Sequence, residues 1–164
     1  MCPDSKASWP TVKDLAETVY KGKVAVTVHV FPLPYHDHAF QMAQAALICT
    51  DTKGTDLGFF PWLELVFKNQ DDFGNDATAN MSRAEVVGGM ATMAMNKLGV
   101  ASSTFLNGMA HSNTYDNAAR QSWKYGCSRG VAGTPTFFIN GVRVADAQPT
   151  WSVADWQKVI DPLL

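Results

Sequence analysis

The amino-acid sequence predicts an α/β fold in a single domain, on the basis of three observations. A run rich in β-branched residues, Lys23–Phe31, is typical of a buried strand. Asn140-Gly141 separates two apolar runs and predicts a β-hairpin, because this dipeptide suits a type I′ turn. Helical periodicity and capping patterns occupy most of the chain between these two features. A length of 164 residues suits one domain with its own hydrophobic core.

The chain begins with a predicted helix over residues 4–20, where apolar residues recur at helical spacing. Pro10 interrupts this segment and predicts either a kink or a helix that starts afresh. Gly22 is expected to end it, and the strand Lys23–Phe31 follows. Residues 32–36, PLPYH, then form a rigid turn, because their prolines suit neither a helix nor a paired strand.

A block of helices is expected next. Asp37 is the predicted N-cap of an alanine-rich helix, and Ser82 with Glu85 forms a capping-box pattern that introduces a helix to Leu98. After the hairpin, Ser152 is expected to cap a final helix over residues 152–160. The remaining predicted elements are helices over 60–70, 102–110 and 114–125, and hairpin strands over 134–139 and 142–145.

Composition and charge exclude two classes of partner. A formal charge of -2 provides no basic field for nucleic acid or an anionic membrane surface. The longest apolar runs are far shorter than the roughly 18 residues of a membrane-spanning helix. We therefore expect neither a nucleic-acid partner nor a membrane.

The segment Cys2-Pro3-Asp4-Ser5 carries the candidate chemistry. A thiolate is the nucleophile of thiol–disulfide exchange, and the N-terminus of a helix favours negative charge. Cys2 is expected at such a terminus, with Ser5 one turn further on and able to donate its hydroxyl hydrogen to the thiolate. Asp4 is expected to face solvent. A serine oxygen cannot attack a mixed disulfide, so the site has one working thiol.

Four segments in order resemble the DsbA-like branch of the thioredoxin superfamily. They are CPDSKASWP, PLPYH with its following alanine-rich helix, FFPWLELVFKNQDDF and GVAGTPTFFINGVRV. The resemblance implies a thioredoxin-like fold with an inserted helical block over about residues 36–127, and a core formed by about 1–35 and 128–164. It also implies a cis peptide bond before Pro135, catalytic residues Cys2 and Ser5, and substrate-binding residues Pro3, Asp4, Thr134, Pro135 and His36.

The sequence departs from this family pattern at two points. The second cysteine of the C-P-x-C motif is replaced by Ser5, and the first core strand, which precedes the motif in the family, is missing. An unmade buried hydrogen bond costs about 1 to 3 kcal/mol, whereas a domain is stable by only about 5 to 15 kcal/mol. We therefore expect the natural chain to extend upstream of Met1, or another chain to supply the strand.

The expected function is that of a thiol–disulfide oxidoreductase or isomerase acting as a monothiol through Cys2 on thiol-containing proteins or peptides. No cofactor is expected beyond an external thiol such as glutathione. The resemblance also implies a secretory or extracytoplasmic location. The main alternative is a redox-inactive module that binds peptides at the edge formed by Pro135. A kappa-type glutathione transferase ranks last, because that family has a serine where Cys2 stands.

The other polar and thiol residues receive structural interpretations. His36, Asp37 and His38 are not expected to bind a metal, because residues two apart on a helix point to different faces. Cys49 follows an apolar run and is expected to be a buried thiol. Cys127 remains open: it is either unpaired, a second resolving thiol, or the disulfide partner of Cys49.

Overall fold

The computed structural model describes residues 1–164, and its backbone contacts define two compact units. The first unit contains Met1 and Val30–Gly130. The second contains Cys2–His29 and Val131–Leu164. No helix combines the length and hydropathy that crossing a bilayer requires.

The second unit begins with helix α1 (Pro3–Asp14), which continues directly into one turn of π-helix, η1 (Leu15–Val19). Pro10 lies inside α1 and does not end it, so the expectation of a helix starting afresh there is wrong. Gly22 follows the helix with a φ of 77°, a backbone conformation that glycine adopts without steric cost.

The segment after α1 differs from its prediction. Residues 24–33 form no regular secondary structure, so the predicted strand Lys23–Phe31 is wrong. Exposure nevertheless alternates as in a strand: Val24, Val26 and Val28 are half-buried, whereas the residues between them are exposed. A strand needs the ladder hydrogen bonds of a neighbouring strand, and the sheet of this structure consists of the two strands of the hairpin.

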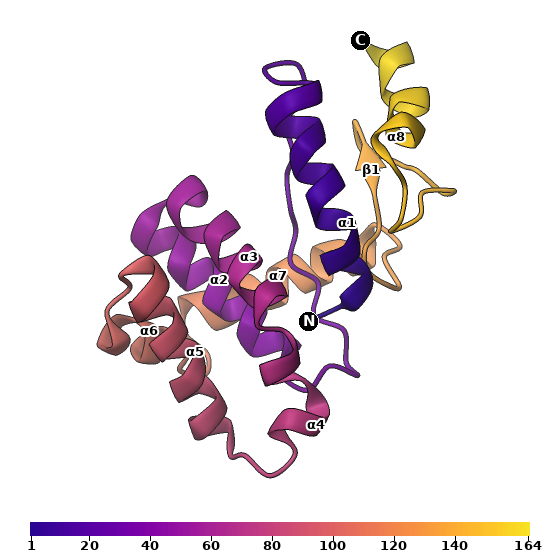
Figure 1. Cartoon of the computed structure of the whole chain (residues 1–164). Helices are drawn as coiled ribbons and strands as arrows, with labels where there is room; N and C mark the ends of the chain where they lie inside the picture. The colour runs from indigo at the N-terminus through magenta and orange to yellow at the C-terminus, as the bar shows by residue number, and fades with distance from the viewer. The chain divides into compact units, whose positions relative to one another are not determined.

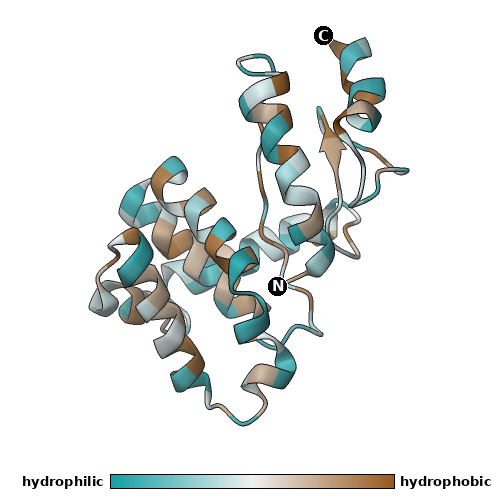
Figure 2. Ribbon diagram, viewed as in Figure 1, coloured by the Kyte–Doolittle hydropathy of each residue, from teal (hydrophilic) through white to brown (hydrophobic).

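The predicted hairpin is confirmed, although its strands are short. Strand β1 (Phe138–Ile139) pairs antiparallel with β2 (Val142–Arg143). Asn140 and Gly141 have φ values of 49° and 80°, the positive pair that a type I′ turn requires. Figure 2 shows β1 as hydrophobic, and Ile139 packs against the core of its unit.

The core of the second unit is an aromatic and aliphatic cluster beneath the hairpin. Leu15, Tyr20, Trp156 and Ile160 are its buried members. Helix α8 (Val153–Ile160) supplies two of them, and the predicted cap is confirmed, since Ser152 forms a capping box with its N3 residue. The Trp156 ring contacts the rings of Phe137 and Trp151 edge-on, and the ring centroids are 4.9 Å apart in each pair. A final 3-10 turn, η4 (Asp161–Leu163), provides the carboxylate that accepts the Tyr20 hydroxyl.

The first unit is helical, and α2 (Ala39–Lys53) runs through its centre (Figure 1). Helix α2 contacts α3, α5, α6 and α7 of the same unit. Its neighbours in chain order are η2 (Thr55–Phe59), α3 (Phe60–Lys68), η3 (Asp71–Phe73), α4 (Asn75–Thr78), α5 (Arg83–Leu98), α6 (Ser102–Gly108) and α7 (Thr114–Ser128). The helices predicted over 60–70, 102–110 and 114–125 therefore exist with shifted ends, and the Ser82 capping box is confirmed.

Small residues let other elements approach α2 closely. A Cβ atom added to Gly58 would lie 2.1 Å from the Cys49 carbonyl oxygen, so only glycine fits there. The Trp62 indole N–H donates to the Met42 carbonyl at 3.1 Å, which satisfies the polar end of a ring that is only 1% exposed. This close packing explains why α2 is buried on several faces.

The start of α2 corrects one sequence prediction. The N-cap is His38, not Asp37. The Asp37 N–H donates instead to the Asn75 side-chain oxygen at 3.1 Å, and the Asn75 side-chain amide donates to the Tyr35 carbonyl at 2.9 Å. Asn75 of α4 therefore holds the turn before α2 from both sides, and Asp37 belongs to that turn.

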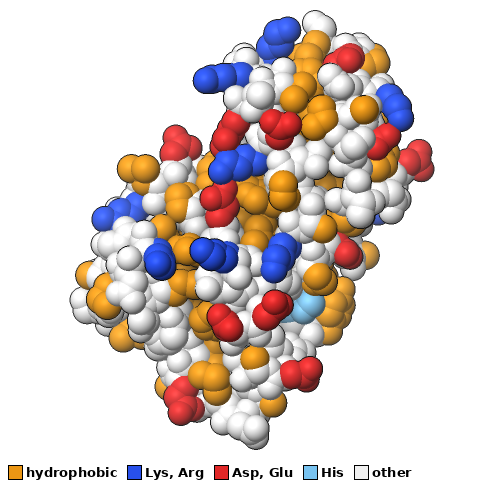
Figure 3. Space-filling view, viewed as in Figure 1, with side chains coloured by type: hydrophobic (Ala, Val, Ile, Leu, Met, Phe, Trp, Pro, Cys, Tyr) orange, Lys and Arg blue, Asp and Glu red, His pale blue; other side chains and the backbone are white.

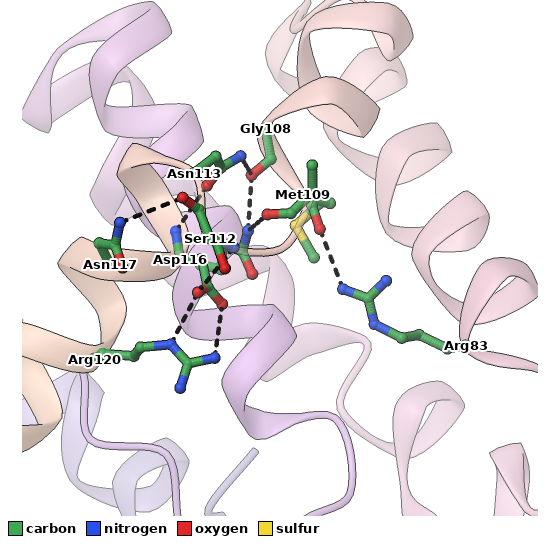
Figure 4. A network of polar contacts seen from close by, with 10 residues as sticks. Arg83, Gly108, Met109, Ser112, Asn113, Asp116, Asn117 and Arg120 are labelled. Carbon is green, nitrogen blue, oxygen red and sulfur yellow. Dashed lines mark hydrogen bonds and ion pairs between the residues drawn. The ribbon is translucent and has the colours of Figure 1, made fainter.

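A buried carboxylate organises the junction between α6 and α7 (Figure 4). Asp116 is 2% exposed and accepts the Ser112 N–H at 3.2 Å and the Arg120 Nε–H at 2.8 Å. The Arg120 guanidinium is the main reason that the pKa of Asp116 lies below its ordinary value. Asn113 caps α7 by accepting the Asp116 N–H at 2.9 Å.

Replacing Asp116 by alanine is expected to destabilise the fold by about 2 kcal/mol at pH 7, because the Ser112 N–H and the Arg120 guanidinium both lose the buried carboxylate that accepts from them. A carboxyl group whose pKa is lowered by folding stabilises the folded protein at pH values above its ordinary pKa of about 3.9. This contribution is lost as the pH falls through the pKa of the folded state. The free energy of unfolding in urea should therefore differ between wild type and Asp116→Ala at neutral pH, and this difference should become smaller below about pH 4. The exposed Asp72→Ala variant is the control, and a pH-independent difference would contradict this role of the Asp116 charge.

Charged side chains are distributed without a large patch of one sign on the face that Figure 3 shows. Basic and acidic groups are interspersed there, with hydrophobic side chains between them. This distribution agrees with the small formal charge of -2 and provides no extended electrostatic footprint on that face.

Candidate functional site

Cys2 lies at the N-terminus of α1. It is the N-cap residue, with φ -69° and ψ 126°, and its carbonyl accepts the Lys6 N–H at 3.2 Å. Pro3 occupies the first turn, where its missing N–H costs nothing. The first N–H groups of a helix have no intrahelical acceptor, so this terminus is suited to a negatively charged sulfur.

The Cys2 thiol contacts the loop that precedes the hairpin. Its Sγ–H donates to the Thr134 carbonyl oxygen at 3.1 Å, across 132 residues of sequence. The following Thr134–Pro135 peptide bond is cis. The Thr134 hydroxyl is buried and has no hydrogen-bond partner, whereas the Thr136 hydroxyl donates to the Gly133 carbonyl at 2.7 Å. Cys2, Thr134 and Pro135 all belong to the second unit.

The other residues of the Cys2-Pro3-Asp4-Ser5 segment differ in exposure. Pro3 and Asp4 are exposed, and Ser5 is half-buried. Ser5 occupies position N3, one turn from Cys2, and its carbonyl accepts the Ser8 hydroxyl at 3.1 Å. The protonated Cys2 thiol donates to Thr134 and not to Ser5. Donation from Ser5 to a Cys2 thiolate therefore remains a prediction.

His36 is described within the first unit, whereas the other predicted site residues lie in the second. It is half-buried in the turn before α2. Burial lowers the pKa of its imidazole, and the positive charge of the chain's N-terminus lowers it further. Both effects favour the neutral form of the His36 imidazole.

The remaining thiols are unpaired. Cys49 is fully buried, as predicted, and burial raises the pKa of its thiol to about 12. Cys127 is exposed near the end of α7, and no disulfide joins it to Cys49. No group of three or more His, Cys, Asp or Glu side chains has an arrangement that holds a metal ion.

Sequence reasoning missed one buried polar residue of the first unit. Gln70, which follows α3, is 8% exposed, and its side-chain amide donates to the carbonyl of Met1, the residue before Cys2. Its only sequence signal is a polar residue directly after an apolar helix, and that signal does not reveal a partner 69 positions away.

Comparison with known proteins identifies the fold and the family of the chain. The crystal structure of a putative protein-disulfide isomerase from Pseudomonas syringae matches with a TM-score of 0.80 and 18% identity, over 97% of this chain and 87% of that one. At this identity the match shows a shared fold. No curated protein matches the sequence significantly. The family described as thioredoxin matches residues 2–162. Because this match spans nearly the whole sequence, the chain belongs to the thioredoxin family.

Proposed function

We propose that the protein is a DsbA-like catalyst of thiol–disulfide exchange that works as a monothiol through Cys2. The observation that carries the proposal is the position of the Cys2 sulfur, at the N-terminus of α1 and 3.1 Å from the Thr134 carbonyl. This position combines a helix terminus that favours a thiolate with a neighbouring backbone segment against which a peptide can lie. Membership of the thioredoxin family supports the proposal.

The exchange begins when the Cys2 thiolate attacks one sulfur of a substrate disulfide. A new S–S bond forms between Cys2 and that sulfur, the substrate S–S bond breaks, and the second substrate sulfur leaves as a thiolate. The electron pair of the broken bond stays on the leaving sulfur. No net oxidation occurs, because one disulfide replaces another.

Ser5 decides how the mixed disulfide is released. A cysteine at this position would attack the Cys2 sulfur and complete a two-electron reduction of the substrate. A serine oxygen does not do so at neutral pH. Release therefore requires an external thiolate, such as that of glutathione or of another cysteine in the substrate, which attacks the mixed disulfide and frees the Cys2 thiolate. This is the behaviour of an isomerase or a monothiol exchange catalyst.

The proposed substrate is an extended, cysteine-containing segment of a protein or peptide. Thr134, Pro135 and the exposed Pro3 and Asp4 are its proposed contacts, and all four belong to the second unit. His36 belongs to the first unit, and its part in substrate binding stays a prediction. The family resemblance implies an extracytoplasmic setting for this chemistry. The Pseudomonas syringae protein is described as a putative protein-disulfide isomerase, and that description names the same reaction class.

Incubation of the reduced protein with oxidised glutathione tests this function. We expect one glutathione adduct, which peptide mapping by mass spectrometry places on Cys2, because this thiol combines accessibility with a helix N-terminus. The exposed Cys127 serves as the internal control for accessibility alone. Modification of Cys127 in preference to Cys2 would contradict the proposal and favour a redox-inactive, peptide-binding module.

A further inference from the structure

We infer that the reduced Cys2 thiol occupies the backbone acceptor that an extended substrate uses, so that the Thr134 carbonyl passes between Cys2 and the substrate. This inference rests on the proposed function, because it concerns how the same site takes up and releases a peptide. Cys2 and Thr134 both belong to the second unit, so the contact lies within one compact part of the chain.

The contact that carries the inference joins the thiol to the loop before the hairpin. The Cys2 Sγ–H donates to the Thr134 carbonyl oxygen at 3.1 Å, and this bond is partly buried. An N-cap side chain usually accepts from a backbone N–H in the first turn of its helix. Cys2 is the N-cap of α1, but its side chain forms no such bond. The sulfur is therefore engaged by the loop and not by its own helix.

Thr134 is suited to pair with an extended peptide that lies beside Cys2. In an antiparallel pair of strands, a residue exchanges both its N–H and its carbonyl with the residue opposite. Pro135 has no N–H and cannot form such a pair, whereas Thr134 has both groups. A peptide beside the Cys2 sulfur therefore needs the same carbonyl to which the thiol donates.

The thiol and a peptide N–H compete as donors to this oxygen. A carbonyl oxygen has two lone pairs, but a first hydrogen bond draws electron density from the oxygen and makes it a poorer acceptor for a second. A thiol is a weak donor, whereas a backbone N–H is a strong one. The peptide should therefore displace the thiol from the Thr134 carbonyl, and Cys2 then loses its contact with the loop.

The same exchange follows the chemical state of the sulfur. A thiolate and a mixed disulfide have no S–H, so in both forms Cys2 cannot donate to Thr134. The carbonyl is consequently available to the substrate while the substrate is covalently attached. An external thiolate then breaks the mixed disulfide, and the freed Cys2 thiolate takes up a proton from solvent. The thiol that results returns to the Thr134 carbonyl and competes with the product, which favours release.

A peptide that cannot undergo disulfide exchange tests this competition. The probe is insulin B chain with its cysteines blocked by iodoacetamide, added to the reduced protein at about pH 5, where protonation of thiols is favoured. The infrared S–H stretching band of Cys2 is the difference between wild type and Cys2→Ala, because Cys49 and Cys127 are present in both. At saturating peptide we expect this band to move to higher wavenumber, as it does when a thiol loses its acceptor.

The affinity for the same peptide is the second measurement, made by calorimetric titration of folded variants. The dissociation constant of Cys2→Ala should be lower than that of the wild type by about two-fold to three-fold, because alanine does not compete for the carbonyl. Cys2→Ser keeps a donor at this position and should bind no more tightly than the wild type. Cys127→Ala, in the first unit, is the control and should have the wild-type affinity.

A Cys2 band that keeps its position at saturating peptide would overturn the inference, and so would a Cys2→Ala affinity equal to or weaker than that of the wild type. Absence of binding by every variant would overturn it as well. If Cys2→Ala does not fold, Cys2→Ser supplies the reference spectrum. The proposed function is judged separately, by the glutathione adduct on Cys2, which forms or fails to form without any peptide.

Discussion

Replacing Cys2 by alanine is expected to reduce the rate at which the protein reactivates scrambled ribonuclease to the rate of the glutathione buffer alone. The reason is that Cys2 supplies the only thiol at the N-terminus of α1, and the attack on a substrate disulfide needs that thiolate. The measurement is the recovery of ribonuclease activity in a redox buffer, with wild type and Cys2→Ala compared at equal concentration.

The matched control for this loss is Cys127→Ala. Cys127 is exposed and Cys2 is half-buried, so a reaction governed by accessibility alone would depend more on Cys127. We expect Cys127→Ala to retain wild-type activity. The side-chain hydrogen bond that Cys2→Ala removes comes from a thiol, which is a weak donor. The variant should therefore unfold at about the same urea concentration as the wild type. Activity that survives in Cys2→Ala would place the chemistry elsewhere in the chain.

Replacing Ser5 by cysteine is expected to give the protein a dithiol activity that it lacks. The new thiol would lie at N3 of α1, one turn from Cys2, where side chains three positions apart are neighbours. It can attack the Cys2 mixed disulfide and release the reduced substrate, leaving an intramolecular disulfide between Cys2 and the introduced thiol. Reduction of insulin with dithiothreitol as the terminal reductant should accelerate by on the order of ten-fold or more over the wild type.

Ser8→Cys is the control for this gain. Ser8 lies on the same helix, is 7% exposed and donates to the Ser5 carbonyl, but it is two turns from the N-cap. A thiol introduced there should produce no increase in insulin reduction. An equal gain from Ser5→Cys and Ser8→Cys would show that any added thiol suffices, and would remove the special role that we assign to the Cys2-Pro3-Asp4-Ser5 geometry.

The helices and the hairpin could be predicted from the sequence because their signals are local. Ser82 and Ser152 each meet a carboxylate three residues later, and Asn140-Gly141 supplies two adjacent positive φ values. Each of these signals lies within four residues and needs no knowledge of the rest of the chain. The N-cap of α2 could not be predicted in this way, because Asp37 is engaged by Asn75 from a different helix.

The strand prediction over Lys23–Phe31 failed for a related reason. β-Branched composition and alternating exposure describe a segment that suits a sheet, but a strand also needs a partner from elsewhere in the chain. Composition indicates that a segment suits a sheet, but it does not show whether another segment pairs with it. The structure accordingly has two short paired strands, both within the hairpin.

The same distinction between local signals and long-range contacts holds for the candidate site. Cys2 and Ser5 could be singled out from the sequence because they are three residues apart at a recognisable helix start. The expectation that the Thr134-Pro135 segment takes part came from the family resemblance and not from any local pattern. The contact between Gln70 and Met1 spans 69 residues and is made by a single side-chain amide, so no periodicity or capping rule predicts it.

The most direct test of the central claim follows the glutathione adduct of the reduced wild-type protein in time. The account predicts that the adduct forms on Cys2, persists after the free glutathione is removed, and disappears only when an external thiol is added, because Ser5 cannot resolve it. An adduct carried by Cys127 alone, or a Cys2 adduct that resolves without any added thiol, would contradict the account.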